Sequence, residues 1–356
     1  QTEAVLRTQT GRLGHTLLGG VEVGRQRTEN FRNTGYYNNT ATTYAVDFSA
    51  PTVRVPITFR QSANDADNNT VVDVVSAYVQ DQIAISKHVQ AIGGVRFERF
   101  DVAFHNNRND TDLSRKDDLI SPRAGLIVKP IEQLSVYGSY SVSYLPSSGD
   151  QFGSLTATTQ TLEPEQFTNY ELGTKWDIRP NLSISLAAFQ LDRTNTSAPD
   201  PQDATRIVQT GSQRAKGGEV SIAGDITTKW HVVAGVAMQK AEITSRTTAA
   251  VAGQVVPLVP ERSMSVWNRY DVTGVVGLGL GVYSQSDMFA AIDNTVTLPG
   301  YTRLDGAVFI KAHPLVRVQI NVENLLDEEY FGTSHGNNNI LPGAGRTIKI
   351  ALTTRR

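Results

Sequence analysis

The sequence predicts an all-β protein, namely a transmembrane antiparallel β-barrel of which this chain supplies about fifteen strands. Apolar and polar residues alternate along many segments, which is the period of a strand with two different faces. Short turns alternate regularly with long polar connections. The polar faces carry many small and hydroxyl side chains, which suit a wide, wet lumen better than a packed core.

The alternation is clearest near the end of the chain. Between residues 316 and 323 the even positions are Val, Val, Ile and Val, and the odd positions are Arg, Gln, Asn and Glu. Ile348, Ile350 and Leu352 repeat the pattern in a last strand. A soluble β-sandwich would show the same alternation in single strands, so the connections between strands have to separate the two architectures.

Taken in order, the strand signals form hairpins with short turns. We expect paired strands at residues 3–10 and 15–29, 71–86 and 88–104, 121–129 and 133–145, 166–178 and 181–193, 205–227 and 230–246, 258–272 and 274–289, and 297–312 and 315–326. The connections between hairpins are long and polar: residues 30–70, 105–120, 146–165, 194–204, 247–257, 290–296 and 331–345. Outer-membrane barrels have short periplasmic turns and long extracellular loops, whereas compact soluble domains rarely carry so many long loops. A buried sandwich is the less favoured alternative.

The strand faces favour the same architecture. Val276, Leu278, Leu280 and Val282 alternate with glycines at 277, 279 and 281, which predicts an apolar face toward lipid and a small-residue face toward a lumen. Aromatic residues on the apolar parity lie near both strand ends, as expected for two interfacial girdles: Trp176, Trp230 and Tyr270 near short turns, and Tyr144, Tyr170 and Tyr330 near long loops. Trp267 falls on the polar parity, which this pattern does not explain.

Composition excludes several classes of function. The chain has 33 basic and 35 acidic residues, so no basic field indicates a nucleic-acid partner. It has no cysteine, which excludes disulfides and thiol chemistry. No apolar run approaches the roughly 20 residues of a transmembrane helix, whereas a barrel strand needs only alternate apolar residues over about 10 positions. No cofactor is expected.

A motif near the end of the chain carries a family resemblance. The segment Asn321-Val322-Glu323-Asn324-Leu325-Leu326-Asp327-Glu328-Glu329-Tyr330, followed by Asn337-Asn338-Asn339, Pro342-Gly343 and Arg346, resembles the terminal motif of TonB-dependent outer-membrane receptors. Within that family it is most similar to the catecholate and hydroxamate ferric siderophore receptors. More diffuse similarity runs through residues 79–82, 94–97, 162–165 and 170–173.

The resemblance implies a function and a location. The protein would lie in the bacterial outer membrane, bind a ferric siderophore at its extracellular loops and import it, driven by the TonB-ExbB-ExbD complex. Other scarce ligands of this family, such as cobalamin, haem or a glycan, remain alternatives. A passive porin and a barrel enzyme are the rival classes.

The resemblance also implies that the chain is incomplete. Receptors of this type have 22 strands around a plug domain. Single-chain bacterial barrels have an even strand count, whereas about fifteen strands are expected here. We therefore expect residues 1–356 to be a partial barrel, with the plug, the TonB box and the first strands preceding residue 1.

The candidate binding residues come from the long polar connections. Arginine supplies charge and a stacking plane, and tyrosine or phenylalanine supplies a face for a catechol ring, so an anionic, aromatic ferric complex could be held by them. For any one of them, ordinary loop packing is at least as good an explanation. The candidates are Tyr36, Tyr37, Arg108, Arg115, Phe152, Phe331 and His335.

Neither catalysis nor direct metal binding is expected. Residues 332–336 read Gly-Thr-Ser-His-Gly, but the nucleophile-elbow motif needs a strand that runs into a helix, and here an Asn-rich loop follows Ser334. Of the six histidines, only His105 and His335 fall in long connections, and neither has a second His or Cys at ligand spacing. We expect iron to arrive already held by a chelator.

Overall fold

The strands form one large antiparallel sheet. The computed structural model describes residues 1–47, 49–146, 155, 159–200, 203–246 and 251–354. Within them lies a 15-stranded sheet in which each strand pairs with the next one in the list, so the predicted strand number is confirmed. Its strands are β1 Thr2–Thr10, β2 Leu13–Phe31, β5 Asp67–Ala84, β6 Val89–Asn106, β7 Thr111–Ile131, β8 Leu134–Leu145, β9 Glu165–Arg179, β10 Leu182–Asp200, β11 Asp203–Asp225, β12 Trp230–Ile243, β13 Arg262–Asp271, β14 Val276–Gln285, β17 Tyr301–His313, β18 Val316–Glu323 and β21 Thr347–Thr354.

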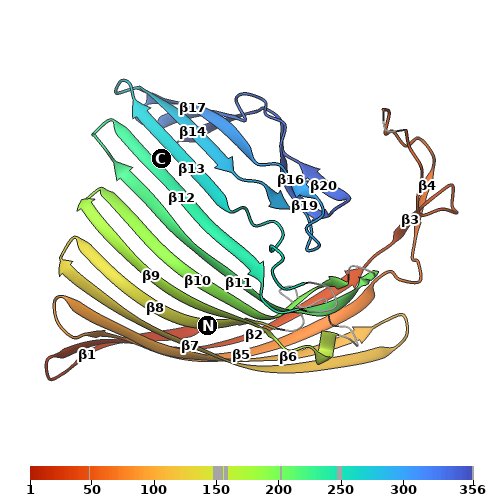
Figure 1. Cartoon of the computed structure of the whole chain (residues 1–356), viewed down its shortest axis with the longest axis horizontal. Coiled ribbons are helices and arrows are strands. Elements are labelled where there is room, and N and C mark those ends of the chain that lie inside the picture. Colours follow the sequence, from red (N-terminus) through yellow and green to blue (C-terminus); the bar gives the residue numbers. More distant parts are fainter. Residues whose placement is uncertain (48, 147–154, 156–158, 201–202, 247–250, 355–356) are drawn as a thin grey trace.

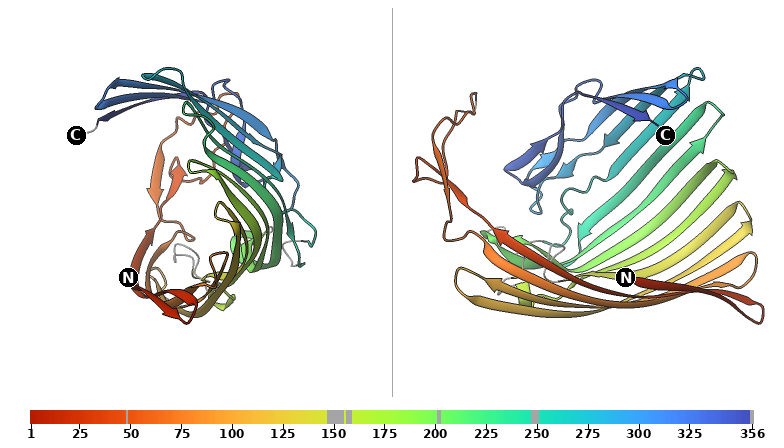
Figure 2. Two further views of the ribbon diagram at one scale, coloured as in Figure 1. Left: turned by 90° about the vertical axis from the view of Figure 1, so that its left-hand side faces the viewer. Right: turned by 180° about the vertical axis from the view of Figure 1, so that it is seen from behind.

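The sheet curves into an open barrel wall. The short turns lie along one end of the strands and the long connections along the other (Figure 1). Viewed from the side, the wall is a trough whose two margins are the first and last strands, β1 and β21, which are the ends of the strand order (Figure 2). Among the described residues, no helix has the length and hydropathy needed to cross a membrane.

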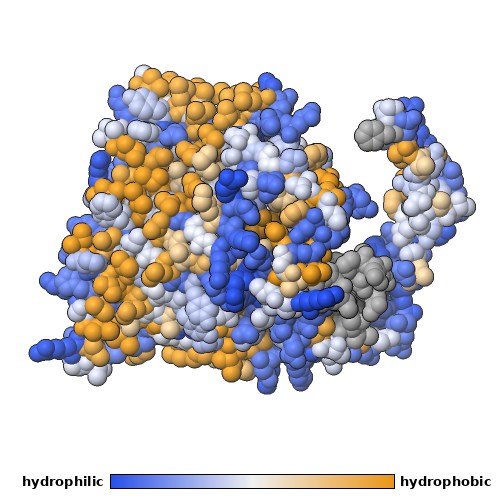
Figure 3. Space-filling view, viewed as in Figure 1, coloured by the Kyte–Doolittle hydropathy of each residue, from blue (hydrophilic) through white to orange (hydrophobic). Residues whose placement is uncertain are grey.

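The convex face is apolar, as predicted. Register places Leu278 beside Val308, Val308 beside Ile320 and Ile320 beside Ile350, so one apolar row crosses four strands. The convex side seen in Figure 3 is covered with apolar side chains over β9 to β14, and it becomes hydrophilic toward the long connections. The side chain of Leu278, for example, is half exposed. A continuous exposed apolar surface of this kind is unusual for a protein in water, so this face suits lipid.

The concave face explains Trp267. A side chain added at Gly279 or Gly281 would lie 2.7 Å from the Trp267 ring, so the indole lies directly over these two glycines. Tyr137 covers Gly173 in the same way. Aromatic residues that cover glycines on a neighbouring strand supply the packing that glycine lacks, and the glycines at 279 and 281 supply the space that the indole ring needs.

Two predicted long connections are wrong. The segment 105–120 is mostly strand, because β6 continues to Asn106 and β7 begins at Thr111. Cross-strand ion pairs hold this polar ladder together, including Arg99 Nε with Asp118 Oδ1 at 2.6 Å. Similarly, β10 extends to Asp200 and β11 begins at Asp203, where residues 194–204 were expected to form a loop. Polar composition marked the end of the apolar band rather than the end of the strands.

The remaining connections contain small hairpins. β3 (Thr34–Tyr37) pairs with β4 (Ile57–Arg60), β15 (Met288–Phe289) with β16 (Thr297–Leu298), and β19 (Phe331–Gly336) with β20 (Asn339–Pro342). Met288, Ala290 and Leu298 form a buried cluster against which Ile340 of β20 packs. The last two hairpins therefore pack together into one cap at the long-loop end.

Candidate functional site

The hairpin of β3 and β4 carries two of the predicted binding residues. The guanidinium of Arg60 lies 3.7 Å from the centre of the Tyr36 ring. The Tyr37 ring lies 5.4 Å from Tyr44. Stacking on an aromatic face leaves the edge of a guanidinium free to donate hydrogen bonds, although here Arg60 also donates to Asn39.

Asp65 fastens the base of this hairpin. Its buried carboxylate accepts hydrogen bonds from the Ser62 amide at 2.7 Å, from Arg32 Nε at 2.8 Å and from Thr34 Oγ1 at 2.8 Å. The Ser62 amide bond, followed by the bonds from Arg32 and Thr34, holds the pKa of Asp65 well below its usual range despite burial. Arg108 closes the same base by donating to the carbonyls of Ser62 and Asp65.

Arg115 lies on the concave side of the sheet. Its strand position is opposite Val102, whose side chain is buried in the apolar cluster with Val72 and Leu155. Arg115 Nε donates to Asp117 Oδ1 at 2.7 Å, and Nη1 donates to the Gln160 carbonyl at 2.7 Å. It thereby ties part of the connection between β8 and β9 to the inner wall.

Phe331 and His335 lie in β19, on the cap hairpin, and both are exposed. Between them, Ser334 Oγ donates to the Ala290 carbonyl at 2.7 Å, and its strand runs into β20 rather than a helix. The serine therefore joins two connections in the cap. Phe152 lies outside the described residues.

The predicted candidates do not converge on one point. The hairpin of β3 and β4 stands clear of β19 and β20 both from the front (Figure 1) and from behind (Figure 2). Tyr36 and Tyr37 therefore lie well away from Phe331 and His335, and the cations of Arg108 and Arg115 are already paired within the protein. A ligand could meet these groups in sequence but could not touch them all at once.

A compact cluster lies elsewhere, on the inner wall where β14 and β17 approach the cap. We call Tyr283, Tyr301, Arg303 and Tyr330 the Tyr-Arg cluster. The ring centres of Tyr301 and Tyr330 are 4.3 Å apart, and those of Tyr283 and Tyr301 are 6.4 Å apart in a stacked arrangement. The Arg303 guanidinium lies 5.7 Å from the centre of the Tyr283 ring.

Arg303 retains one unused donor. Its Nη1 donates to Tyr330 Oη at 3.2 Å and its Nη2 to Asp305 Oδ2 at 2.9 Å. Its Nε is buried and, among the described residues, has no hydrogen-bond partner. A buried donor without an acceptor costs free energy, which an anionic ligand could recover.

The terminal motif positions Tyr330. Asn324 is buried with a left-handed backbone (φ 54°), and its side-chain amide donates to the carbonyls of Glu328 and Ala344. Its Oδ1 accepts from the Glu328 amide at 2.8 Å. The Tyr330 ring then lies on Gly343, where any side chain would collide with it. Tyr330 thus faces Tyr301 on the inner wall, and its assignment to the outward aromatic girdle was wrong.

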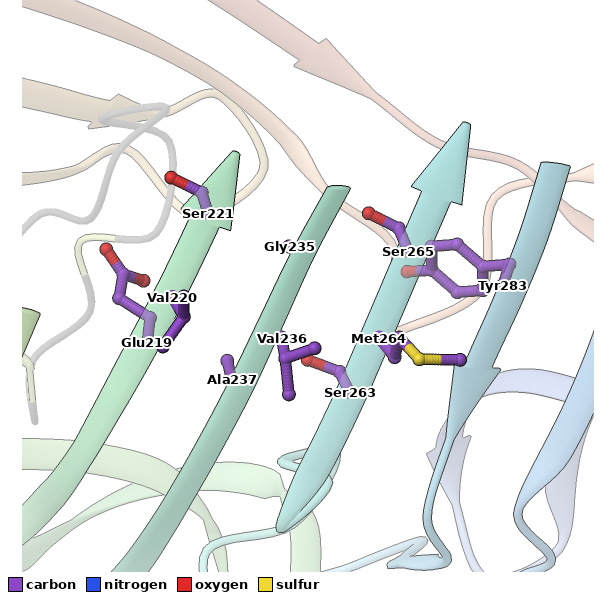
Figure 4. A pocket seen from close by; sticks show the side chains of 10 residues that line it. All are labelled: Glu219, Val220, Ser221, Gly235, Val236, Ala237, Ser263, Met264, Ser265 and Tyr283. Atoms are coloured by element: carbon purple, nitrogen blue, oxygen red, sulfur yellow. The ribbon is translucent and has the colours of Figure 1, made fainter. Parts of the chain in front are cut away.

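A polar wall continues from the cluster around the barrel. Ser221, Gly235, Ser265, Tyr283 and Arg303 form one register row across five strands. Figure 4 shows Tyr283 directed toward Ser265 over a shallow pocket of about 210 Å³ that Glu219, Ser221 and Ser263 also line. Hydroxyl groups can both donate and accept hydrogen bonds, so this wall can exchange partners with a polar solute.

The cluster consists of phenol and guanidinium groups, whose chemistry suits contact with a solute better than metal ligation. Stacked phenol rings beside a guanidinium can hold an anionic, aromatic solute. Among the described residues there is no group of three or more His, Asp or Glu side chains arranged to hold a metal ion. The sequence did contain a signal for this site, because Tyr283 continues the inward parity of Gly277, Gly279 and Gly281, and Arg303 pairs with it.

Comparison with known proteins gives one family. The family described as "TonB dependent receptor-like, beta-barrel" matches residues 2–325. The chain is 26% identical to the probable TonB-dependent siderophore receptor PiuA of Acinetobacter baumannii, covering 96% of this chain and 50% of that protein. It is also 26% identical to the catecholate siderophore receptor Fiu of Escherichia coli K12, covering 98% of this chain and 50% of that protein. The chain therefore spans about half the length of these relatives.

Solved structures agree in fold. The crystal structure of PiuA from Acinetobacter baumannii superimposes with a TM-score of 0.84 at 24% identity, covering 98% of this chain and 54% of that one. The closed form of the ferric-catecholate import receptor Fiu from Escherichia coli K12 gives 0.83 at 25% identity, covering 99% and 53%.

Proposed function

Because the chain belongs to the family of TonB-dependent receptor-like β-barrels, which are outer-membrane proteins, we propose that it forms the barrel wall of a ferric siderophore importer. The long connections would capture the ferric complex outside the cell, and the complex would pass along the inner wall to the periplasm. The observation that carries this proposal is the Tyr-Arg cluster, which places phenol rings and the Arg303 guanidinium together on the inner wall. Both suit an anionic catechol-bearing chelate.

The two kinds of site would act in order. Tyr36 and Tyr37, on a hairpin that projects from the barrel, would make first contact with the complex, as would Phe331 and His335 on the cap. The Tyr-Arg cluster would hold it next. Arg108 and Arg115 would act indirectly, because Arg108 holds the base of the β3–β4 hairpin and Arg115 holds part of the connection between β8 and β9.

The rest of the importer would lie outside residues 1–356. The relatives are about twice as long as this chain, and within the part of the chain that the structure describes β1 and β21 each have one strand edge without a partner in the sheet. Unpaired backbone groups cannot remain in lipid, so further strands would close the wall between these edges. With these strands the barrel would have 22, and a plug with a TonB box would fill its lumen. The TonB-ExbB-ExbD complex would supply the energy for import.

Uptake of radiolabelled iron tests the proposal. Cells that carry or lack the gene are supplied with ferric catecholate, ferric hydroxamate and ferric citrate complexes. We expect gene-dependent uptake with a catecholate complex and its loss when TonB is absent. Equal uptake of all three chelates with and without the gene would refute the siderophore assignment.

A further inference from the structure

An apolar groove lies on the outer face of the wall, where β9 to β12 meet. It has a volume of about 700 Å³ and is lined mainly by apolar side chains, among them Leu172, Leu186, Val220 and Met238. Ala188 and Gly218 are opposite each other in the register and form its low floor between these larger neighbours. An acyl chain that lies in this groove makes van der Waals contacts on several sides, whereas on a smooth barrel wall it would make them on one side only.

Two lysines lie immediately beyond the groove on the same face. Lys216 follows the parity of Gly218, and Lys240 follows that of Met238, two residues farther toward the long connections. The register places Lys216 directly opposite Lys240. Like charges at directly opposed positions repel each other, so this arrangement is unfavourable without an anion nearby.

The surrounding carboxylates compensate only in part. Lys240 pairs with Glu242, and Arg214 pairs with Asp192. Among the residues that the structure describes, Lys216 forms no ion pair, and its side chain is exposed. Asp192 also lies close enough to Lys216, and Glu261 close enough to Lys240, to interact electrostatically. The carboxylates therefore neutralise the rim in part, and Lys216 is the lysine that none of them contacts directly among the described residues.

The height of the lysines in the membrane follows from the strands. Three residues on this face lie at nearly the same height along their strands. The spans from each residue to the short turn of its hairpin are 170–179 for Tyr170, 216–225 for Lys216 and 230–240 for Lys240. A tilted strand crosses the hydrocarbon layer in about 9 to 11 residues. The ring centres of Tyr170 and Tyr140 are 5.2 Å apart on this face, as expected for aromatic residues of an interfacial girdle. The lysines thus reach the head-group level of the outer leaflet.

We propose that this face binds a phosphorylated lipid of the outer leaflet. One phosphate would lie between Lys216 and Lys240, and an acyl chain would fill the groove over Ala188 and Gly218. The phosphate relieves the repulsion between the lysines, and the acyl chain makes contacts that a groove left to mobile lipid tails would lack. The lipid would be a tightly bound annular lipid at β9 to β12, on the opposite face of the wall from the proposed siderophore path.

Native mass spectrometry of the full-length protein in detergent tests this site. The probes are lipid A and the same glycolipid with its phosphates removed. We expect lipid A to bind with one retained copy, and the joint change Lys216→Gln and Lys240→Gln to weaken it about 30-fold, since each cation near an anionic head group contributes about 1 kcal/mol. Ala188→Phe should weaken binding of both lipids, because it fills the groove without altering charge.

Lys116→Gln is the matched control, because Lys116 is also exposed but pairs with Asp101 on β6 at 2.9 Å, away from the groove. It should leave lipid A binding unchanged. Equal binding of the two lipids, or undiminished binding in the double lysine variant, would overturn the proposal. Siderophore binding measured on the same samples should not change, so failure here is distinguishable from failure of the importer assignment.

Discussion

At the scale of single residues, the sequence indicated which types of side chain suit a ligand, but not what each of those side chains contacts in the folded protein. Arg108 and Arg115 were predicted to contact ligand, yet the structure pairs them with carbonyls and a carboxylate of their own chain. The cost of leaving a cation unpaired makes such internal use common. Tyr283, Tyr301 and Arg303 were missed because they lie within strands and not in the polar connections where candidates were sought.

The Tyr-Arg cluster predicts a defined loss of affinity. Tyr301→Leu keeps an apolar side chain between Tyr283 and Tyr330 but removes the stacking face. We expect about 2- to 10-fold weaker binding of a ferric catecholate, since one aromatic contact contributes about 0.5 to 1.5 kcal/mol. Fluorescence quenching titration measures it. Tyr170→Leu, on the outer face, is the control and should bind as the unaltered protein does; an equal loss in both variants would argue against the cluster.

Asp65 predicts a pH-dependent fastening of the outer hairpin. Hydrogen bonds from Ser62, Arg32 and Thr34 lower the pKa of Asp65 in the folded loop. Their contribution is complete above the unfolded carboxyl pKa of about 4 and is lost as the pH falls toward the lower folded value. Proteolysis between residues 33 and 64 should therefore stay slow from pH 7 to about pH 4.

The variant Asp65→Asn should be cut faster in the same segment from pH 7 to about pH 4, because it keeps the shape but loses the charge that Arg32 pairs with. The barrel strands should remain resistant in both proteins. Cleavage at the rate of the unaltered protein would mean that Asp65 does not hold this connection. Asp47→Asn is the control, since the carboxylate of Asp47 accepts hydrogen bonds from nearby Ser49 and, among the described residues, ties no distant segment to the loop.

At the scale of elements, the strands and short turns were predictable and the strand ends were not. Alternation reports which residues face lipid, so it located β14 and β18 closely. Beyond the lipid boundary both faces are polar, and alternation disappears while pairing continues. The ladder between β6 and β7 persists there through ion pairs such as Lys116 with Asp101. No local pattern distinguishes such a polar strand from a loop.

The match between Trp267 and the glycines of β14 predicts a paired effect on stability. Gly279→Ala would force its methyl group to within 2.7 Å of the indole ring, and we expect a loss of about 1 to 3 kcal/mol. Trp267→Ala in the same chain should restore most of the tolerance for that methyl group. Gly235→Ala, where the nearest atom is at 3.9 Å, should change little. Urea unfolding in detergent micelles measures all three, and equal losses at both glycines would contradict the packing.

At the scale of the whole molecule, the two faces of the wall differ in polarity: the apolar outer face suits lipid, and the polar inner face suits water and solutes. Val236 lies on the outer face, whereas the next residue, Ala237, faces inward opposite Glu219. We expect Val236→Arg to destabilise the barrel by about 2 to 4 kcal/mol, the cost of a cation near the bilayer centre. Ala237→Arg should be tolerated, because it meets the polar lumen and a carboxylate. Reversible unfolding from lipid vesicles compares them; equal cost for both would contradict the assigned faces.

The most direct test of the orientation is a spin-label scan along β12, with one label at a time from Val232 to Met238. The register predicts that labels at 232, 234, 236 and 238 contact lipid and respond to oxygen, whereas labels at 233, 235 and 237 respond to a water-soluble nickel chelate. A two-residue alternation in that phase would support the barrel wall and, with it, a solute path past the Tyr-Arg cluster. The opposite phase, or uniform protection from both reagents, would contradict it.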